Sequence, residues 1–154
     1  MKNNLKVKGQ YSFEIYDVDG QLRDSWKSDN LVVNGGLAFI TGLLGGTGTV
    51  PTYLALGTSS TAVAGSQTAL VSEITTDGLA RAEGTVSQET DTVTDDTFQI
   101  TETFNATGSQ TIEEAGVFNA ASGGTMLSRA LTGTKAISNG ENIVVTYQLV
   151  LANA

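Results

Sequence analysis

Two adjacent carboxylates, Glu113 and Glu114, precede the apolar run Ala115–Phe118 and are the side chains of this sequence best placed for acid–base chemistry. Such chemistry requires both groups to converge on one substrate beside a pocket. The surrounding pattern predicts a β-strand, in which neighbouring side chains point to opposite faces of the sheet. At most one carboxylate can therefore face inward, where Arg129 on the next predicted strand is its natural partner. We expect a structural ion pair between Glu113 or Glu114 and Arg129, and no catalytic residues.

Two oxygen-rich segments are candidates for cation binding. The segment DVDG, Asp17–Gly20, resembles the start of a calcium loop, but Arg23 stands where a further ligand is needed. Asp-Gly is typical of a tight hairpin turn, which is the interpretation we adopt. The segment ETDTVTDDT, residues 89–97, offers oxygen ligands for a hard cation, but we interpret it as an exposed loop between two strands. Its carboxylates are Glu89, Asp91, Asp95 and Asp96. We expect no metal site.

The composition excludes most other kinds of catalytic and cofactor site. The chain has no histidine and no cysteine, so it contains no disulfides, no imidazole or thiolate ligands and no His-based triad. The glycine-rich segments 45–51 and 56–65 lack the Lys-Ser/Thr of a phosphate loop and the spacing of a dinucleotide site. We expect that the protein is not an enzyme and binds no cofactor.

Charge is distributed unevenly along the chain. The net charge is −8, yet the first thirty residues carry five basic and five acidic side chains and are neutral. The acidic remainder repels phosphate backbones, so we expect no nucleic-acid binding. No apolar run approaches the ~18 to 20 residues of a membrane span, so we expect no membrane partner. Lys2, Lys6 and Lys8 make residues 1–10 a candidate arm that docks on an acidic partner; a solvated, frayed terminus is the alternative.

The elements that position these residues are mostly strands. Low charge content, 18 glycines and repeated apolar–polar alternation predict seven or eight strands in residues 11–154. One short helix is expected near residues 34–44, with Asn34 as its cap and Gly45 after its end, because leucine and isoleucine recur there at helical spacing. A chain of 154 residues fits one domain. The sequence predicts an all-β, single-domain β-sandwich or jelly-roll-like barrel.

Four motifs in a fixed order carry a resemblance to a known group. They are NLVVNGGL at residues 30–37, LGTSS at 56–60, TIEEAGVF at 111–118, and Arg129 shortly after the Gly123-Gly124 turn. In this order they resemble small β-rich virion structural proteins of tailed bacteriophages and prophages. The likeness extends from about Tyr11 to Leu151. It implies a component of the virus particle, located either on the head or on the tail, with no catalytic residues to assign.

Within that group we expect a capsid decoration (cement) protein. Such a protein would bind the major capsid protein on the head surface, bridge neighbouring subunits and form a homo-oligomer, with a trimer favoured at symmetry axes. The alternative location is the tail, as a tail or tail-fibre component. A carbohydrate-binding module fits less well because aromatic residues make up only 6% of the chain. Trp26, the single tryptophan, is either an anchor of an interface or part of the core.

Overall fold

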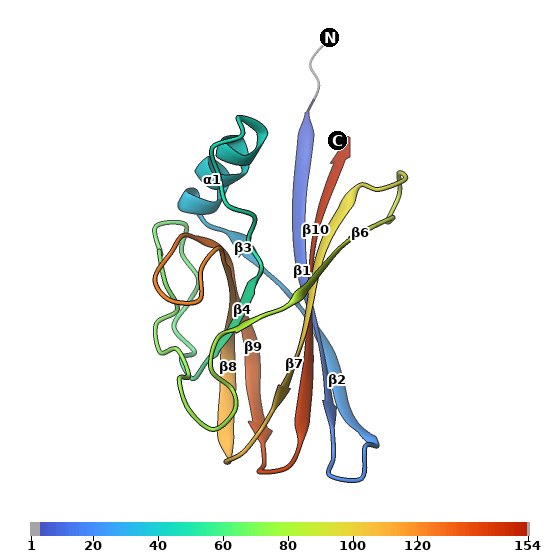
Figure 1. Ribbon diagram of the computed structural model, residues 1–154, viewed down its shortest axis with the longest axis vertical. Helices are drawn as coiled ribbons and strands as arrows, with labels where there is room; N and C mark the ends of the chain where they lie inside the picture. Colours follow the sequence, from blue (N-terminus) through green and yellow to red (C-terminus); the bar gives the residue numbers. More distant parts are fainter. Residues whose placement is uncertain (1–3, 154) are drawn as a thin grey trace.

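The computed structural model describes residues 4–153 and shows two antiparallel five-stranded sheets packed face to face, with one short helix at one end (Figure 1). The predicted all-β sandwich is confirmed. Both sheets are open and have edge strands, so the jelly-roll-like barrel is not the arrangement found. Sheet 1 has the order β2-β1-β10-β7-β6, and sheet 2 has the order β3-β9-β8-β4-β5.

The strands of the two sheets and the helix have the following bounds. Sheet 1 comprises β1 (Leu5–Tyr16), β2 (Leu22–Asp29), β6 (Thr85–Glu89), β7 (Thr97–Asn105) and β10 (Asn142–Asn153). Sheet 2 comprises β3 (Leu31–Val32), β4 (Tyr53–Gly57), β5 (Ala82–Glu83), β8 (Gln110–Phe118) and β9 (Met126–Ile137). The helix α1 spans Asn34–Leu44.

The strand count exceeds the predicted seven or eight because two-residue strands carry no readable alternation. Residues 82–89 look like one strand in the sequence, but Gly84 divides them between the two sheets and donates its backbone N–H to Thr52. The short β3 similarly follows β2 after the single residue Asn30, so the chain crosses from sheet 1 to sheet 2 there.

The predicted turn at Asp17–Gly20 is confirmed. It joins β1 to β2, and one carboxylate oxygen of Asp17 accepts the backbone N–H groups of Asp19 and Gln21, both at 2.9 Å. Gly20 has φ of 77°, a left-handed conformation that glycine adopts without steric cost. The carboxylate that suggested a calcium ligand is therefore engaged by the turn itself.

Helix α1 forms where the leucine spacing placed it, but its predicted cap is wrong. Val33, in extended conformation, precedes the helix, and no side chain caps the N-terminus. The backbone N–H of Val33 bonds to the carbonyl of Leu127 on β9, and that of Asn34 bonds to the carbonyl of Gly65. Contacts with sheet 2 and with the loop after β4 therefore fix the start of the helix.

The proposed boundary between an arm at 1–10 and a domain at 11–154 does not agree with the described residues. Leu5–Gln10 form the first half of β1 and pair with β10, beginning with Leu5 opposite Asn153. Leu5 and Val7 alternate there with Lys6 and Lys8, so the period of a strand already begins at Leu5. Lys6 and Lys8 thus lie on a strand; Lys2 lies outside the described residues.

The core lies between the sheets and is built from their inward-facing residues. On sheet 1, Tyr11 and Tyr147 are fully buried, with ring centres 4.9 Å apart. On sheet 2, Leu54, Leu56 and Val117 are fully buried. Burial of each large apolar side chain contributes about 1.5 to 3 kcal/mol, so this double layer stabilises the framework that carries the loops.

Candidate functional site

The adjacent residues Glu113 and Glu114 on β8 have different environments. Glu114 on β8 and Arg129 on β9 are both completely buried, with 2.7 Å between Glu114 Oε2 and Arg129 Nε. Glu113 is half-buried and accepts a hydrogen bond from Thr134 at 2.8 Å. The structure thus brings Glu114, and not Glu113, together with Arg129.

Glu114 also holds the long segment between β4 and β5. Its carboxylate accepts the backbone N–H groups of Ser72 at 2.7 Å and Val71 at 3.1 Å. Arg129 extends the network through Nη1 to Gln67 at 3.2 Å. Backbone amides and a guanidinium engage both oxygens, and the side chain is completely buried, so a substrate in solution cannot reach this carboxylate. Its role in the described structure is to fasten residues 67–72 to sheet 2.

A second arginine, Arg81, holds the end of the same segment, and its contacts were not predicted from the sequence. Arg81 forms a two-pronged ion pair with Glu73, at 2.9 and 2.6 Å, and lies 3.6 Å above the centre of the Phe118 ring. It also donates to the carbonyls of Ala120 and Gly123. The usable signal was the scarcity of arginine: the chain has three, and each pairs with a glutamate.

The motifs that carried the phage resemblance converge on this framework. A Cβ at Gly57 would lie 2.5 Å from Glu114 Oε1 and 2.6 Å from the carbonyl of Ser72, so only glycine fits there. A Cβ at Gly36, in the first turn of α1, would overlap the carbonyl of Leu127. These glycines of the motifs therefore permit close packing, of Gly57 against the buried ion pair and of Gly36 against β9.

The acidic segment 89–97 is a turn organised by one of its own carboxylates. Asp96 accepts the backbone N–H groups of Asp91, Thr92 and Val93 at 2.8 to 3.1 Å. These amides, chiefly those of Asp91 and Val93, hold the pKa of Asp96 well below its usual range. Within residues 4–153, no three acidic side chains are grouped as metal ligands.

Adding calcium or removing divalent cations should accordingly leave the melting temperature unchanged. A cation bound only by the folded state would raise stability, because binding shifts the unfolding equilibrium. The check is thermal unfolding followed by circular dichroism, first with excess chelator and then with excess calcium. A calcium-dependent rise of several degrees would show that the segment 89–97 binds a cation.

Trp26 on β2 lies at the margin of the core. Its ring stacks on Phe13, with centres 4.9 Å apart and an angle of 12° between planes, and Lys135 Nζ lies 4.4 Å from the ring centre. The side chain is half-buried. Of the two roles considered for Trp26, these contacts describe core packing; they do not test an interface role.

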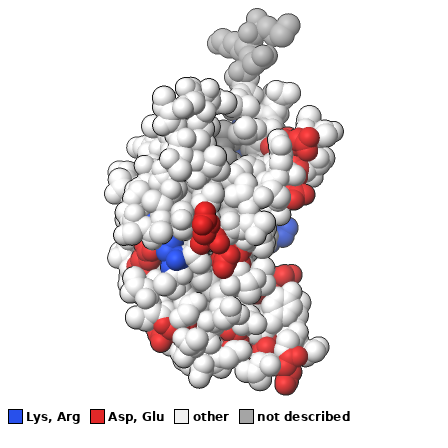
Figure 2. Space-filling model, viewed as in Figure 1, with Lys and Arg blue, Asp and Glu red and all other residues white. Residues whose placement is uncertain are grey.

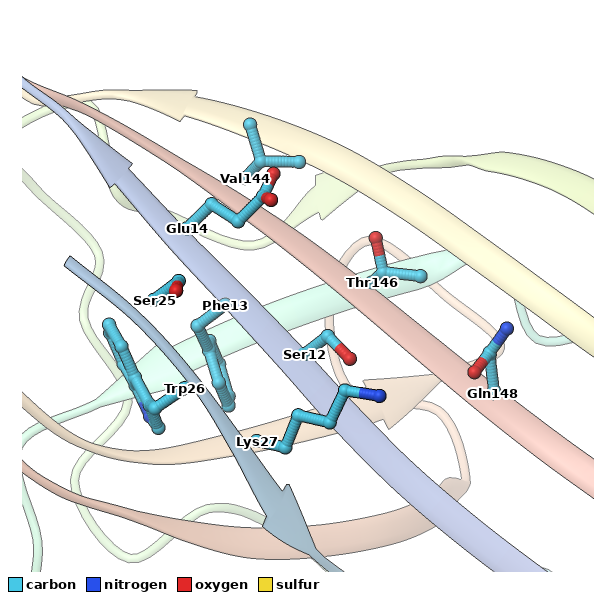
Figure 3. Close-up of a pocket in the computed structure, with 9 residues that line it drawn as sticks. All are labelled: Ser12, Phe13, Glu14, Ser25, Trp26, Lys27, Val144, Thr146 and Gln148. Carbon is cyan, nitrogen blue, oxygen red and sulfur yellow. The ribbon is translucent and has the colours of Figure 1, made fainter. Parts of the chain in front are cut away.

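The outer face of sheet 1 is polar and slightly hollowed. Figure 3 shows Glu14, Lys27, Thr146 and Gln148 around this shallow groove, beside the β2 edge. Gln148 donates to Gln99 at 2.8 Å, which continues a row of amides across the sheet. Figure 2 shows another view in which uncharged groups dominate and acidic groups are scattered.

These features define a class of protein. Its buried charges fasten its own loops, its outer sheet face is polar, and no helix of the described part has the length and apolarity needed to span a membrane. The described residues form an all-β sandwich whose long irregular segment is fastened to one sheet by ion pairs.

The family follows from comparison with known proteins. The family model described as "Podophage GP4 fiber I protein gp80" matches residues 39–151, from within α1 to β10, and the chain belongs to that family. No curated protein and no solved structure matches this chain. The chain is therefore a structural protein of a phage virion, as the resemblance implied. The family description fits the tail alternative better than the capsid cement interpretation.

Proposed function

We propose that this protein is a component of a phage tail fibre, which it helps to build through contacts with other virion proteins and without catalysis. The observation that carries the proposal is the family match over residues 39–151, which includes β4 to β9 and most of β10. The family is described as a fibre protein, and the matched range contains the buried ion pair and three of the four motifs, since NLVVNGGL at residues 30–37 precedes it.

A non-catalytic role is supported by the way the charged groups are used. Glu114, the only completely buried carboxylate among the described residues, is fully engaged by Arg129 and two backbone amides. Asp96 is engaged by its own turn. Neither arrangement leaves a general acid or base beside a substrate pocket.

The test is to assemble particles with and without the protein. If it is a fibre component, particles lacking it should have intact DNA-filled heads and should lack fibres or carry shortened ones in negative-stain micrographs. Purified protein added to these particles should label tails when detected with gold-conjugated antibody. If the label instead covers the heads, and heads without the protein burst on osmotic shock, the fibre proposal is wrong and the cement interpretation is correct.

A further inference from the structure

Sheet 1 has an open backbone edge on each side at the end of the molecule where α1 lies (Figure 1). β1 pairs with β2 only from Gln10 onward, so Leu5–Gly9 have β10 on one side and no strand on the other. β6, the opposite edge, pairs only with β7. Alternate N–H and C=O groups of both edges therefore point away from the sheet and can accept another strand.

The two edges carry opposite charge at the same height of the sheet. Lys8 lies opposite Val150, Val150 opposite Thr97, and Thr97 opposite Glu89, so one row of paired residues joins a lysine on β1 to a glutamate on β6. Both charged side chains belong to the outer face, as does Lys6. Within residues 4–153, no ion pair engages any of the three.

Space and apolar surface accompany the open edge of β1. A groove runs beside Lys6–Gly9 and is bounded on its far side by Asp29–Val32 and Leu37. Leu5 is 67% exposed and Val86 on β6 is 40% exposed, and both lie on the inner side of their strands. A strand added along β1 would fill this groove and cover apolar groups that are otherwise in contact with water.

We propose that β6 of one copy adds antiparallel to Leu5–Gly9 of a second copy, so that sheet 1 continues from one subunit into the next. Sheet 1 alternates strand direction from β1 to β6, and repeating it around an axis parallel to the strands brings β6 antiparallel to the next β1. The outer face then remains outer across the junction. Because different patches meet, the contact is head-to-tail. Pairing Glu89 with Lys6, and not with Lys8 at the same height, adds a shift of two residues along the strands at each junction, so the contact repeats as an open helical array.

The register follows from the charges and from the space beside β2. Glu89 opposite Lys6 places Ser87 opposite Lys8 and ends the new pairing at Gly9, just before β2 occupies the edge. Each charged residue then faces an opposite charge or a hydroxyl. The competing contact, β1 against a second β1, would place lysines opposite lysines, which destabilises a strand pair.

The test measures self-association of the full chain by sedimentation velocity over a concentration series. The wild type should associate, and raising the salt concentration should weaken association. Lys6→Glu and Glu89→Lys should each raise the dissociation constant about tenfold, because each places like charges across the junction. The double variant Lys6→Glu/Glu89→Lys should restore association to near the wild-type level. Lys27→Glu, on the same face but on β2, is the matched control and should have no effect.

Amide hydrogen exchange shows whether each variant is folded and which residues form the contact. Amides of residues 5–9 and 85–89 should become protected as protein concentration rises, while the amides of β8 and β9 remain equally protected in all variants. A chain that stays monomeric would overturn the proposal and show that the edge lysines prevent strand addition. If the dissociation constant is unchanged in both Lys6→Glu and Glu89→Lys, the contact lies elsewhere and the proposal is wrong. Neither result bears on the fibre assignment, which rests on particle assembly.

Discussion

Replacing Arg129 with methionine should lower the free energy of unfolding by about 3 to 5 kcal/mol, since removing one partner of a buried ion pair leaves the other charge uncompensated. The charge left behind is Glu114, which is completely buried and holds the backbone of residues 71 and 72. Urea unfolding monitored by tryptophan fluorescence would give the value, because Trp26 is the only tryptophan and packs on the core.

The matched control for this experiment is the neighbouring residue. Glu113→Gln removes the negative charge of the residue before Glu114. The Glu113 carboxylate is hydrogen-bonded to the exposed hydroxyl of Thr134, so this variant should change the free energy of unfolding by less than about 0.5 kcal/mol. A double variant, Glu114→Gln with Arg129→Met, should recover part of the loss because no buried charge is left unpaired. If Arg129→Met and Glu113→Gln had equally small effects, the buried pair would not be the fastening point of the long segment.

Two adjacent glycines in the first turn of α1 should respond in opposite directions to alanine. Gly36→Ala should destabilise the protein by about 1 to 3 kcal/mol, because the new methyl group overlaps the backbone carbonyl of Leu127 and separates the helix from β9. Gly35→Ala should stabilise it by about 0.5 to 1 kcal/mol, because its nearest neighbour, Thr125 Cγ2, is 3.8 Å away and alanine favours helix.

Thermal unfolding of the two variants side by side would measure this difference. Both changes add one methyl group to the same helical turn, so differences in composition and propensity cancel. Equal effects of the same sign would mean that the helix does not rest on Leu127 in the way the structure shows.

The sequence predicted the sandwich because its longest strands alternate strictly. Along β10, Ile143, Val145 and Tyr147 are completely buried, as their spacing required. The short strands β3 and β5 were missed because two residues cannot show a period. The first half of β1 was assigned to an arm because its lysines suggested a docking segment, although Leu5 and Val7 alternate with Lys6 and Lys8 as in a strand.

The buried ion pair was predictable in kind but not in full. Adjacent positions on a strand allow only one glutamate to face inward, and this led to Arg129 as partner, but the alternation alone did not choose between Glu113 and Glu114. The Arg81–Glu73 pair was not predicted because both residues lie in a long irregular segment without a strand or helix period. Their approach depends on how residues 58–81 fold over sheet 2, and no local pattern encodes that path.

The functional class was predicted better than the location in the particle. Gly36 and Gly57 of the motifs permit close packing, which the fold needs wherever it is used. Attachment to a head or to a tail depends instead on surface complementarity with other chains. This explains why the motifs indicated a virion protein, whereas the preferred cement interpretation is less well supported than the tail alternative.

A cryo-EM reconstruction of the intact tail, at a resolution that allows strands to be traced, is the decisive test of the fibre proposal. Two five-stranded sheets of this sequence should fit the density of a fibre, with Glu114 and Arg129 in contact between β8 and β9. Tracing the same chain on the outer surface of the head, with fibres formed entirely by other proteins, would contradict it.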